Sequence, residues 1–403
     1  MTINPLNSTL FTPDPTQLTH SQGGAHLGPP LLFFSGGSAL TTFSQLLKNF
    51  THNSIHLVTP FDSGGSSAKL REHFCMPAVG DLRSRLLALA DDDFPDGSGI
   101  ADLLSYRLCR NRGQKKLHTE LLTMLSGEHP RVVQISAPLR AIVLSKLSAF
   151  CANMPASFDL RGASIGNLVL AGDYIKHDAK LELCISRFAD MVQVRGRVWP
   201  IVNDNLHLAA VLQNGQTVLG QHNLTGKEVP ALSSPIARIF LTDDLATGKA
   251  VDCQLGERNS RLIAAADLIC YPPGSFYSSL LANFLPKGVG SAIAKNNAPK
   301  VYVPNLGHDP EQLGMSLTES VKTLLNHLMG NDNSQVEANQ VLNYLLIDSK
   351  KGKYCGEVPH SYLKFLGIEV IDVSLVSLRS APYYDNQLLV EALMSLPLRP
   401  AVR

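Results

Sequence analysis

At 403 residues the chain can bury a full hydrophobic core, either as one large domain or as two. Its 35 Lys and Arg residues nearly balance its 34 Asp and Glu residues, so the overall charge does not indicate a nucleic-acid-binding surface. No apolar run approaches the roughly 20 residues that cross a bilayer, and the seven cysteines form no C-x-x-C pair, which favours the buried thiols of a cytoplasmic protein.

The chain begins with a polar stretch and then a strand that ends in glycines. Residues 1 to about 29 are rich in Thr, Pro, Asn, Gly and His and predict a loosely ordered leader. The apolar run 31–34 stops at SGGS and is followed by apolar residues at helical spacing, which predicts strand, glycine turn and helix. The free N–H groups at such a turn attract a phosphate. The candidate phosphate-binding residues are Gly36, Gly37 and Ser38.

A second polar loop repeats this arrangement. Residues 55–59 read as a strand, and the DSGGSS loop at 62–67 follows. Two such loops after neighbouring strands should converge on one crevice. Neither loop fits the P-loop or the dinucleotide fingerprint, and each alone could equally be an ordinary strand-to-helix turn. The candidate residues here are Asp62, Ser63, Gly64, Gly65 and Ser66.

The segments that follow predict a helical insertion. Arg71 and Arg83 could meet a diphosphate or pair with Asp62 and Asp81. Residues 92–160 form the insertion, with helices over 116–125 and 139–151 and a helical pattern through 103–108. The acidic run 91–93 could hold a divalent ion, but a solvated helix end is the favoured interpretation.

The next part of the chain adds an asparagine candidate and an antiparallel excursion. Asn167, in the GASIGN segment, could recognise a base edge or a sugar hydroxyl, or could cap a helix. Residues 191–251 alternate, with a hairpin turn at 213–216, and predict a small antiparallel excursion that includes the VRGRVWP stretch.

The last third returns to the strand-and-helix pattern. The run 264–270 predicts a buried strand that opens into a third glycine- and hydroxyl-rich loop, and 300–305 predicts the next strand, with Asn305 at its tip. A helix over 321–328, strands over 341–347 and 369–373, and a final helix with Asp385 as N-cap complete the chain. The whole pattern predicts an α/β, Rossmann-like, mainly parallel sheet with helices on both faces.

The ordered motifs resemble the CofD/YvcK-like family. Its members carry a GGGTGL-type first loop, a DDGGSSG-type second loop and a P-x-x-GD-x-R segment. The chain matches these with its first two loops and 76–83, and continues with blocks at 161–168, 194–200, 267–279 and 300–305. The resemblance implies one CofD-like α/β domain over 30–403, with a nucleotide pocket formed by the three loops. It adds to the candidates Asp81, Arg83, Gly166, Asn167, Gly274, Ser275, Tyr277 and Asn305.

Two functions follow from this resemblance. The CofD side of the family implies a 2-phospho-L-lactate transferase-like enzyme that uses a GDP-linked donor and Mg²⁺, with Asp62 as the catalytic residue and metal ligand. The alternative is a non-catalytic YvcK-like regulator that binds a UDP-sugar. The expected partner is therefore a nucleotide-linked small molecule, with neither nucleic acid nor membrane, and a homodimer is compatible with either function.

Three positions depart from the motifs of the relatives. Ser63 replaces the second of two adjacent acids, Ala163 replaces a His, and Pro272 replaces the first glycine of a Gly-Pro-Gly-Ser loop. These replacements are what we expect where ligand preference has changed or turnover has been lost.

Overall fold

The computed structural model describes residues 24–226, 229–330 and 336–396. The described part contains a seven-stranded sheet in which every pair of neighbours is parallel. Its strand order is β11-β10-β9-β8-β1-β2-β3. The strands are β1 (Leu31–Ser35), β2 (Ile55–Val58), β3 (Arg197–Pro200), β8 (Leu268–Tyr271), β9 (Lys300–Tyr302), β10 (Tyr344–Ile347) and β11 (Glu369–Asp372).

The strand order reverses beside β1. The chain first adds β2 and β3 on one side of β1 and later adds β8 to β11 on the other side. In open parallel sheets the loops diverge at such a point and leave a crevice beyond the carboxyl ends of the strands. The topology therefore places the loops after β1, β2 and β8 around one position, as the sequence predicts.

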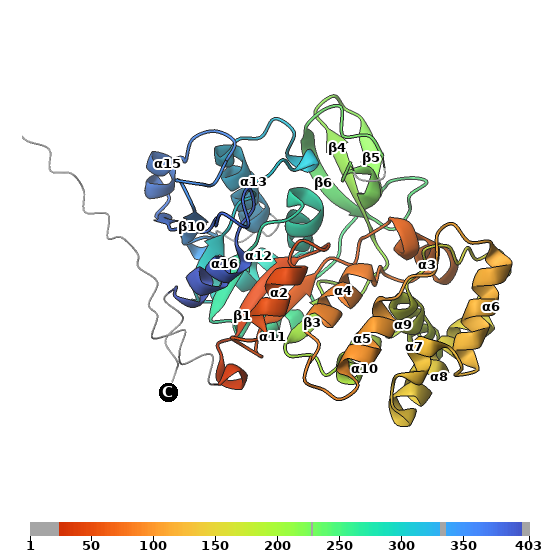
Figure 1. Cartoon of the computed structure of the whole chain (residues 1–403). Helices are drawn as coiled ribbons and strands as arrows, with labels where there is room; N and C mark the ends of the chain where they lie inside the picture. The colour runs from red at the N-terminus through yellow and green to blue at the C-terminus, as the bar shows by residue number, and fades with distance from the viewer. Residues whose placement is uncertain (1–23, 227–228, 331–335, 397–403) are drawn as a thin grey trace, which may run out of the picture.

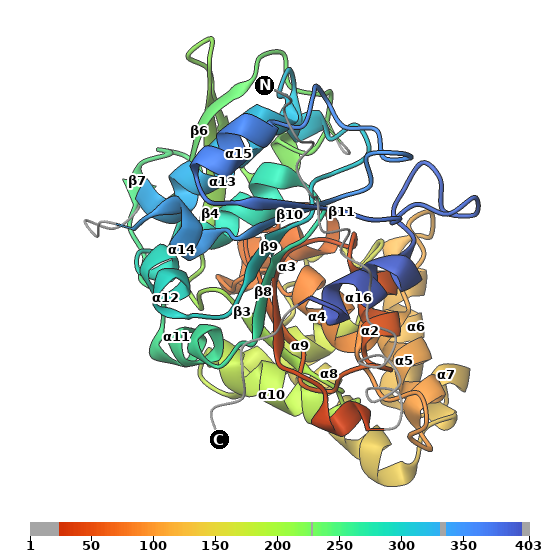
Figure 2. The ribbon, with the colours of Figure 1, turned by 90° about the vertical axis from the view of Figure 1, so that its left-hand side faces the viewer.

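Alternating side chains of the central strands bind two layers of helices. Leu31 and Phe33 pack with α2 and α16, whereas Leu32 and Phe34 belong to the core on the opposite face. Figure 2 shows α2 and α16 on one side of the strands and α13 and α15 on the other. Both faces of the sheet are therefore covered, which is why β1 is buried at every position.

The helices of the sheet layers are α2 (Thr41–Leu47), α3 (Gly65–Phe74), α4 (Gly80–Ala88), α11 (Glu257–Ala264), α12 (Val289–Lys295), α13 (Leu317–Gly330), α14 (Ala338–Val341), α15 (His360–Phe365) and α16 (Asn386–Met394). Short turns of helix occur at η1 (Ala25–Leu27), η2 (Gln221–Asn223), η3 (Phe276–Leu280, a π-helix), η4 (Leu281–Phe284) and η5 (Pro310–Gln312).

Two further layers flank the sheet. A helical layer with its own core contains α5 (Gly97–Ser105), α6 (Gln114–Leu125), α7 (Pro130–Val133), α8 (Ala137–Asn153), α9 (Ile165–Lys176) and α10 (Leu181–Met191). A four-stranded antiparallel sheet contains β4 (His207–Leu212), β5 (Thr217–Leu219), β6 (Ile236–Thr242) and β7 (Ala250–Val251). Figure 1 shows the small sheet at the top of the molecule and the helical layer at the lower right, with α3 and α4 between them.

Several predicted elements differ from the structure. Residues 197–200 were expected in the antiparallel excursion, but they form β3, which pairs in parallel with β2. The predicted strand over 264–270 is wrong at its start, because α11 continues to Ala264 and β8 begins at Leu268. The strand over 341–347 likewise begins later, at Tyr344, after the short helix α14. In the last two cases one apolar run contains both the end of a helix and the start of the next strand.

Other predictions are confirmed. Helices α6 and α8 cover the segments expected to be helical, β4 and β5 form the predicted hairpin, and the Asp385 side chain accepts a hydrogen bond from Gln387 N at the start of α16. The predicted leader lies mostly outside the described residues, apart from 24–29. Within the described residues no helix has both the length and the apolar composition needed to cross a bilayer.

Candidate functional site

A polar pocket of about 360 Å³ lies at the carboxyl ends of the central strands, at the predicted crevice. We call it the switch-point pocket. It draws residues from the three polar loops, the first turns of α3, α4 and α9, the segment after α5, and the connection from β5 to β6 that contains η2. Its lining consists of Gly37, Ser38, Asp62, Gly64, Gly65, Ser66, Ser67, Gly80, Asp81, Arg83, Ser84, Arg107, Arg110, Asn167, Gln221, His222, Thr225, Ser275 and Ser279.

The first loop is held to α4 by a backbone hydrogen bond. Gly37 has φ +61°, which favours glycine, and its N–H donates to Asp81 Oδ2 at 2.7 Å. A Cβ on Gly36 would lie 2.4 Å from Thr59 Oγ1 and 3.2 Å from Ser279 Cα. Gly36 therefore serves the close approach of the three loops, and the pocket is lined by Gly37 and Ser38 instead.

The second loop presents a carboxylate and the start of a helix. Asp62 Oδ1 accepts a hydrogen bond from Gly64 N at 3.0 Å, and α3 begins at Gly65. The N–H groups in the first turn of a helix have no intrahelical acceptor and carry partial positive charge. This turn, with Ser66 and Ser67, borders the pocket and can bind an anion.

Asn167 leaves one polar atom without a partner beside this helix start. Its Nδ2 donates to Ser66 Oγ at 3.3 Å, and the residue is 1% exposed. Within the described part of the chain, its Oδ1 is buried and has no hydrogen-bond partner. Asn167 lies inside α9, and Ser164 holds the N-cap position. The cap interpretation is therefore wrong, and the amide oxygen is available to a donor on a ligand.

Three arginines place positive charge in the pocket. Burial and the nearby Arg107 lower the pKa of Arg83 to about 10, so it stays charged at neutral pH. Burial and the nearby Arg110 lower the pKa of Arg107. Each of these neighbours thus makes the charged form of the adjacent arginine less favourable. In addition, Arg83 Nε is buried and has no hydrogen-bond partner among the described residues. A cluster of like charges of this kind is stabilised when an anion enters it.

The connection from β5 to β6 meets the second loop at Ser63. Ser63 Oγ lies 2.8 Å from His222 Nδ1 and accepts a hydrogen bond from His222 N at 3.2 Å. Ser63 is 7% exposed and does not line the pocket. Ser63, which replaces the second acid of the relatives, therefore anchors His222. The neighbouring Gln221 and Thr225 also line the pocket.

The third loop directs its N–H groups away from the pocket. Gly274 N donates to Asn305 Oδ1 at 2.8 Å, and Phe276 N donates to Asp309 Oδ2 at 2.7 Å. Tyr277 N and Ser278 N both donate to Glu311 Oε2 at 2.8 Å. Internal carboxylates thus occupy the place that we expected for a phosphate. Only the Ser275 and Ser279 part of this segment lines the pocket.

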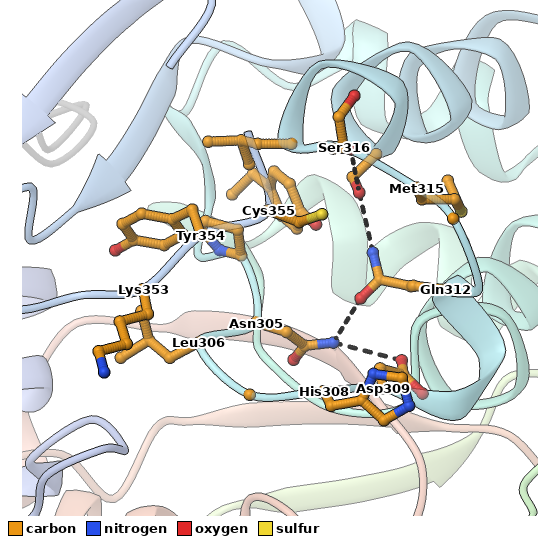
Figure 3. Close-up of a pocket in the computed structure, with 16 residues that line it drawn as sticks. Asn305, Leu306, His308, Asp309, Gln312, Met315, Ser316, Lys353, Tyr354 and Cys355 are labelled. Atoms are coloured by element: carbon orange, nitrogen blue, oxygen red, sulfur yellow. Dashed lines mark hydrogen bonds between the residues drawn. The ribbon is translucent and has the colours of Figure 1, made fainter. Parts of the chain in front are cut away.

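Asn305 borders a different pocket, of about 320 Å³, beyond β9. Figure 3 shows its amide directed at Asp309 and Gln312, to which Nδ2 donates at 3.3 and 3.0 Å. The same Nδ2 also donates to Gly274 O at 2.7 Å. The side chain thus holds the third loop in place, and its amide nitrogen already donates to Gly274 O, Asp309 and Gln312.

The structure brings together ten of the predicted site residues: Gly37, Ser38, Asp62, Gly64, Gly65, Ser66, Asp81, Arg83, Asn167 and Ser275. Outside the lining are Gly36, Ser63, Gly166, Gly274, Tyr277 and Asn305. Gly166 instead allows close packing, because a Cβ there would lie 2.5 Å from Leu104 O. Tyr277 is buried at 4% exposure.

Sequence reasoning missed Arg107 and Arg110. It also missed Gln221, His222 and Thr225 in the connection from β5 to β6. Residues 106–108 were expected in a helix, but α5 ends at Ser105 and Arg107 pairs with Ser164 in an isolated bridge. The RLCRNR run at 107–112 was the available signal, as a local basic cluster. Arg71, which the sequence placed near a diphosphate or Asp62, is buried and donates to Phe61 O, Asp62 O and Leu206 O. These hydrogen bonds hold the second loop in place.

Residues for a metal ion are few. Within the described residues no group of three or more His, Cys, Asp or Glu side chains could hold a metal. Mg²⁺ is often bound by one or two carboxylates together with substrate phosphates. Asp62 fits that role, since it lines the pocket and, within the described residues, only its Oδ1 accepts a hydrogen bond. The acidic run 91–93 is not a metal site, because Asp91 and Asp93 pair with Arg195 and Asp92 pairs with Lys48.

The fold and the pocket define a Rossmann-like α/β protein with an anion-accepting pocket at its switch point. Over residues 31–371 the chain matches the family described as "2-phospho-L-lactate transferase CofD". The chain belongs to the CofD family.

Relatives match most of the chain. The chain is 30% identical over 373 residues to the "Putative gluconeogenesis factor" of Thermoanaerobacterium thermosulfurigenes, covering 92% of this chain and 97% of that one. It is 28% identical over 309 residues to the "Gluconeogenesis factor" of Bacillus subtilis, covering 74% and 75%. A crystal structure of a UPF0052 family member from Bacillus halodurans has a TM-score of 0.66 at 23% identity, over 91% of this chain and 99% of that one, and so shares the fold.

Proposed function

We propose that this protein binds one nucleotide-linked diphosphate, of the UDP-sugar class, in the switch-point pocket and acts as a regulator. The observation that carries the proposal is that Arg83, Arg107 and Arg110 line the same pocket as the start of α3. Guanidinium groups and helix N-termini together are a strong combination for binding phosphate oxygens.

The remaining polar groups suit the other parts of such a ligand. Asn167 Oδ1 is buried without a partner in the described chain and can accept from a base N–H or a sugar hydroxyl. Gln221 and Thr225 supply further donors and acceptors from the connection between β5 and β6. A volume of about 360 Å³ is near the lower end for small-molecule sites. This size favours one bound ligand over a donor and an acceptor held together.

The name of the relatives agrees with a regulator. Proteins that cover most of the same length are named gluconeogenesis factors, which describes an effect on metabolism and not a reaction. The replacement of the second acid by Ser63 points the same way, since that hydroxyl is engaged with His222.

A phosphotransferase of the 2-phospho-L-lactate type is the second candidate. It rests on the family match and on Asp62, the carboxylate that lines the pocket beside the helix start. In that reaction Asp62 would hold Mg²⁺ with the donor phosphates, and the arginines would stabilise the phosphate charge.

A ligand panel tests the proposal. Thermal unfolding of the full chain is measured with UDP-N-acetylglucosamine, UDP-glucose, GDP, GTP and NAD, each with and without Mg²⁺. A ligand at a hundredfold excess over its Kd raises stability by roughly 2.7 kcal/mol, so a true ligand is visible. We expect a response to UDP-sugars without turnover. A response limited to guanine nucleotides, with release of GMP, would support the transferase instead.

The variant Asp62→Asn separates the metal contribution from the nucleotide contribution. Asparagine keeps the shape and the acceptor for Gly64 N but loses the charge, so the fold should be retained. We expect the Mg²⁺-dependent part of ligand binding to disappear while the Mg²⁺-free part remains. Isothermal titration with and without Mg²⁺ measures both parts. Unchanged Mg²⁺ dependence in the variant would make Asp62 a structural residue only.

A further inference from the structure

A pocket of about 620 Å³, larger than the switch-point pocket, lies in the helical layer between α8, α9 and α10. We call it the α8–α10 pocket. Figure 1 shows these three helices grouped beside the main sheet. The two pockets share no lining residue. The function proposed above therefore leaves the α8–α10 pocket unexplained.

A buried ionic cluster forms one wall of this pocket. Asp173 is 2% exposed and pairs with Lys146, whose side chain is 9% exposed. His177 Nε2 and Arg187 Nη1 lie 3.4 and 3.7 Å from Asp173 Oδ1. One carboxylate is thus shared by two permanent cations and a histidine. The lining also contains Lys176 and Asp190, so its three Lys and Arg side chains still outnumber its two carboxylates.

The hydrogen bonds of this cluster are incomplete. Arg187 Nη1 is buried and has no hydrogen-bond partner among the described residues, since it lies 3.7 Å from Asp173 Oδ1, the oxygen that also contacts Lys146. A buried guanidinium N–H without an acceptor is costly. An ion pair that only tied the three helices together would need neither this open donor nor an adjoining cavity.

Apolar side chains form another part of the lining. They include Phe94, Leu139, Ile142 and Met191, and Ile142 is 47% exposed. The volume lies within the usual range of roughly 300 to 1,000 Å³ for small-molecule sites. A lining that combines apolar side chains with an excess of positive charge fits a molecule with an apolar body and one anionic group.

We propose that the α8–α10 pocket is a binding site for a small organic anion, with its carboxylate or sulfonate on Arg187 and Lys146 and its apolar body against Ile142 and Met191. The anionic group supplies the acceptor that Arg187 Nη1 lacks, and the apolar body covers Ile142.

The helix α9 carries residues of both sites on different parts of its length. Asn167 lines the switch-point pocket, and Asp173 lies about 9 Å further along the axis. A change confined to the far end of the α8–α10 pocket should therefore leave nucleotide binding intact. The two proposals can fail separately.

The test uses 8-anilinonaphthalene-1-sulfonate, an aromatic anion that fluoresces when it leaves water, with the full-length protein. We expect saturable binding to the wild type that octanoate displaces and that octylammonium and octanol do not. Arg187→Gln and Ile142→Asp should each weaken probe binding by about tenfold or more, since each removes a charge-assisted hydrogen bond or an apolar contact.

Controls make the outcome decisive. Lys180→Gln removes one exposed charge beside the start of α10, outside the pocket, and should bind the probe as the wild type does. Thermal unfolding establishes that each variant folds, and Ile142 is exposed, so its replacement should be tolerated. The proposal fails if the probe does not bind, if Arg187→Gln and Ile142→Asp both bind it normally, or if octylammonium displaces it as well as octanoate.

Discussion

Replacing Arg107 and Arg110 together by glutamine is expected to weaken nucleotide binding by about a hundredfold or more, at unchanged protein stability. Hydrogen bonds to charged groups contribute roughly 1.5 to 3 kcal/mol each, and both guanidinium groups line the switch-point pocket. Arg107 is exposed and donates to Gly162 O through one nitrogen only, so its loss should not disturb the fold. Isothermal titration with the ligand identified in the panel measures the effect.

A matched variant controls for the loss of two positive charges. Lys115→Gln together with Lys116→Gln removes the same charge from the exposed start of α6, which does not line the pocket. This control should bind within about twofold of the wild type, because exposed charges act weakly at a distance in salt. Equal affinity in the arginine variant and the lysine variant would refute the arginine cluster as the phosphate site.

Replacement of Glu311 should have the largest effect on stability. Its carboxylate accepts hydrogen bonds from Tyr277 N, Ser278 N and Ser278 Oγ, and the residue is 1% exposed. Glu311→Ala leaves three buried donors without an acceptor, so we expect a loss of roughly 3 kcal/mol or more in the free energy of unfolding. Glu311→Gln keeps an acceptor oxygen and should lose much less. Chemical denaturation of both variants measures the difference.

Glu311 should also make stability depend on pH. Burial and the nearby Asp309 raise the pKa of Glu311 from 4.5 to about 7. The folded state therefore holds a proton that the unfolded state releases, and this contribution is full below about pH 4.5 and is lost as pH rises through 7. The wild type should lose stability relative to Glu311→Gln between about pH 5 and pH 8. The exposed Glu357→Gln should run parallel to the wild type, and parallel curves for Glu311→Gln would contradict the titration.

The sequence predicts the architecture well because its signals are local. The apolar run 31–34, the glycines after it and the helical spacing that follows all lie within a few residues of one another, and they correctly place β1, its turn and α2. The meeting of the first two loops follows from the topology, and residues of both loops line the switch-point pocket. The parallel pairing of β3 could not be predicted, since alternation along one strand does not specify the direction of its neighbour.

The parts of the site that sequence reasoning missed depend on contacts between distant residues. The third loop has the composition of a phosphate-binding turn, but its N–H groups bond Asp309 and Glu311, which lie more than 30 residues further along. Ser63 meets His222 across 159 residues. No local pattern in either segment indicates such partners. The arginine at 107 was misplaced because an apolar pattern continued past the end of α5.

The position of β1 at the centre of the sheet also affects how the chain must fold. β2 is made soon after β1 and pairs with one edge of it, whereas the other edge waits for β8, about 230 residues later. Until Leu268–Tyr271 has been synthesised, an apolar central strand therefore has an unpaired edge, which is a template for aggregation. Such long-range pairing folds slowly. A fragment that ends before β8 would expose this edge permanently, so it should not be soluble without the rest of the chain.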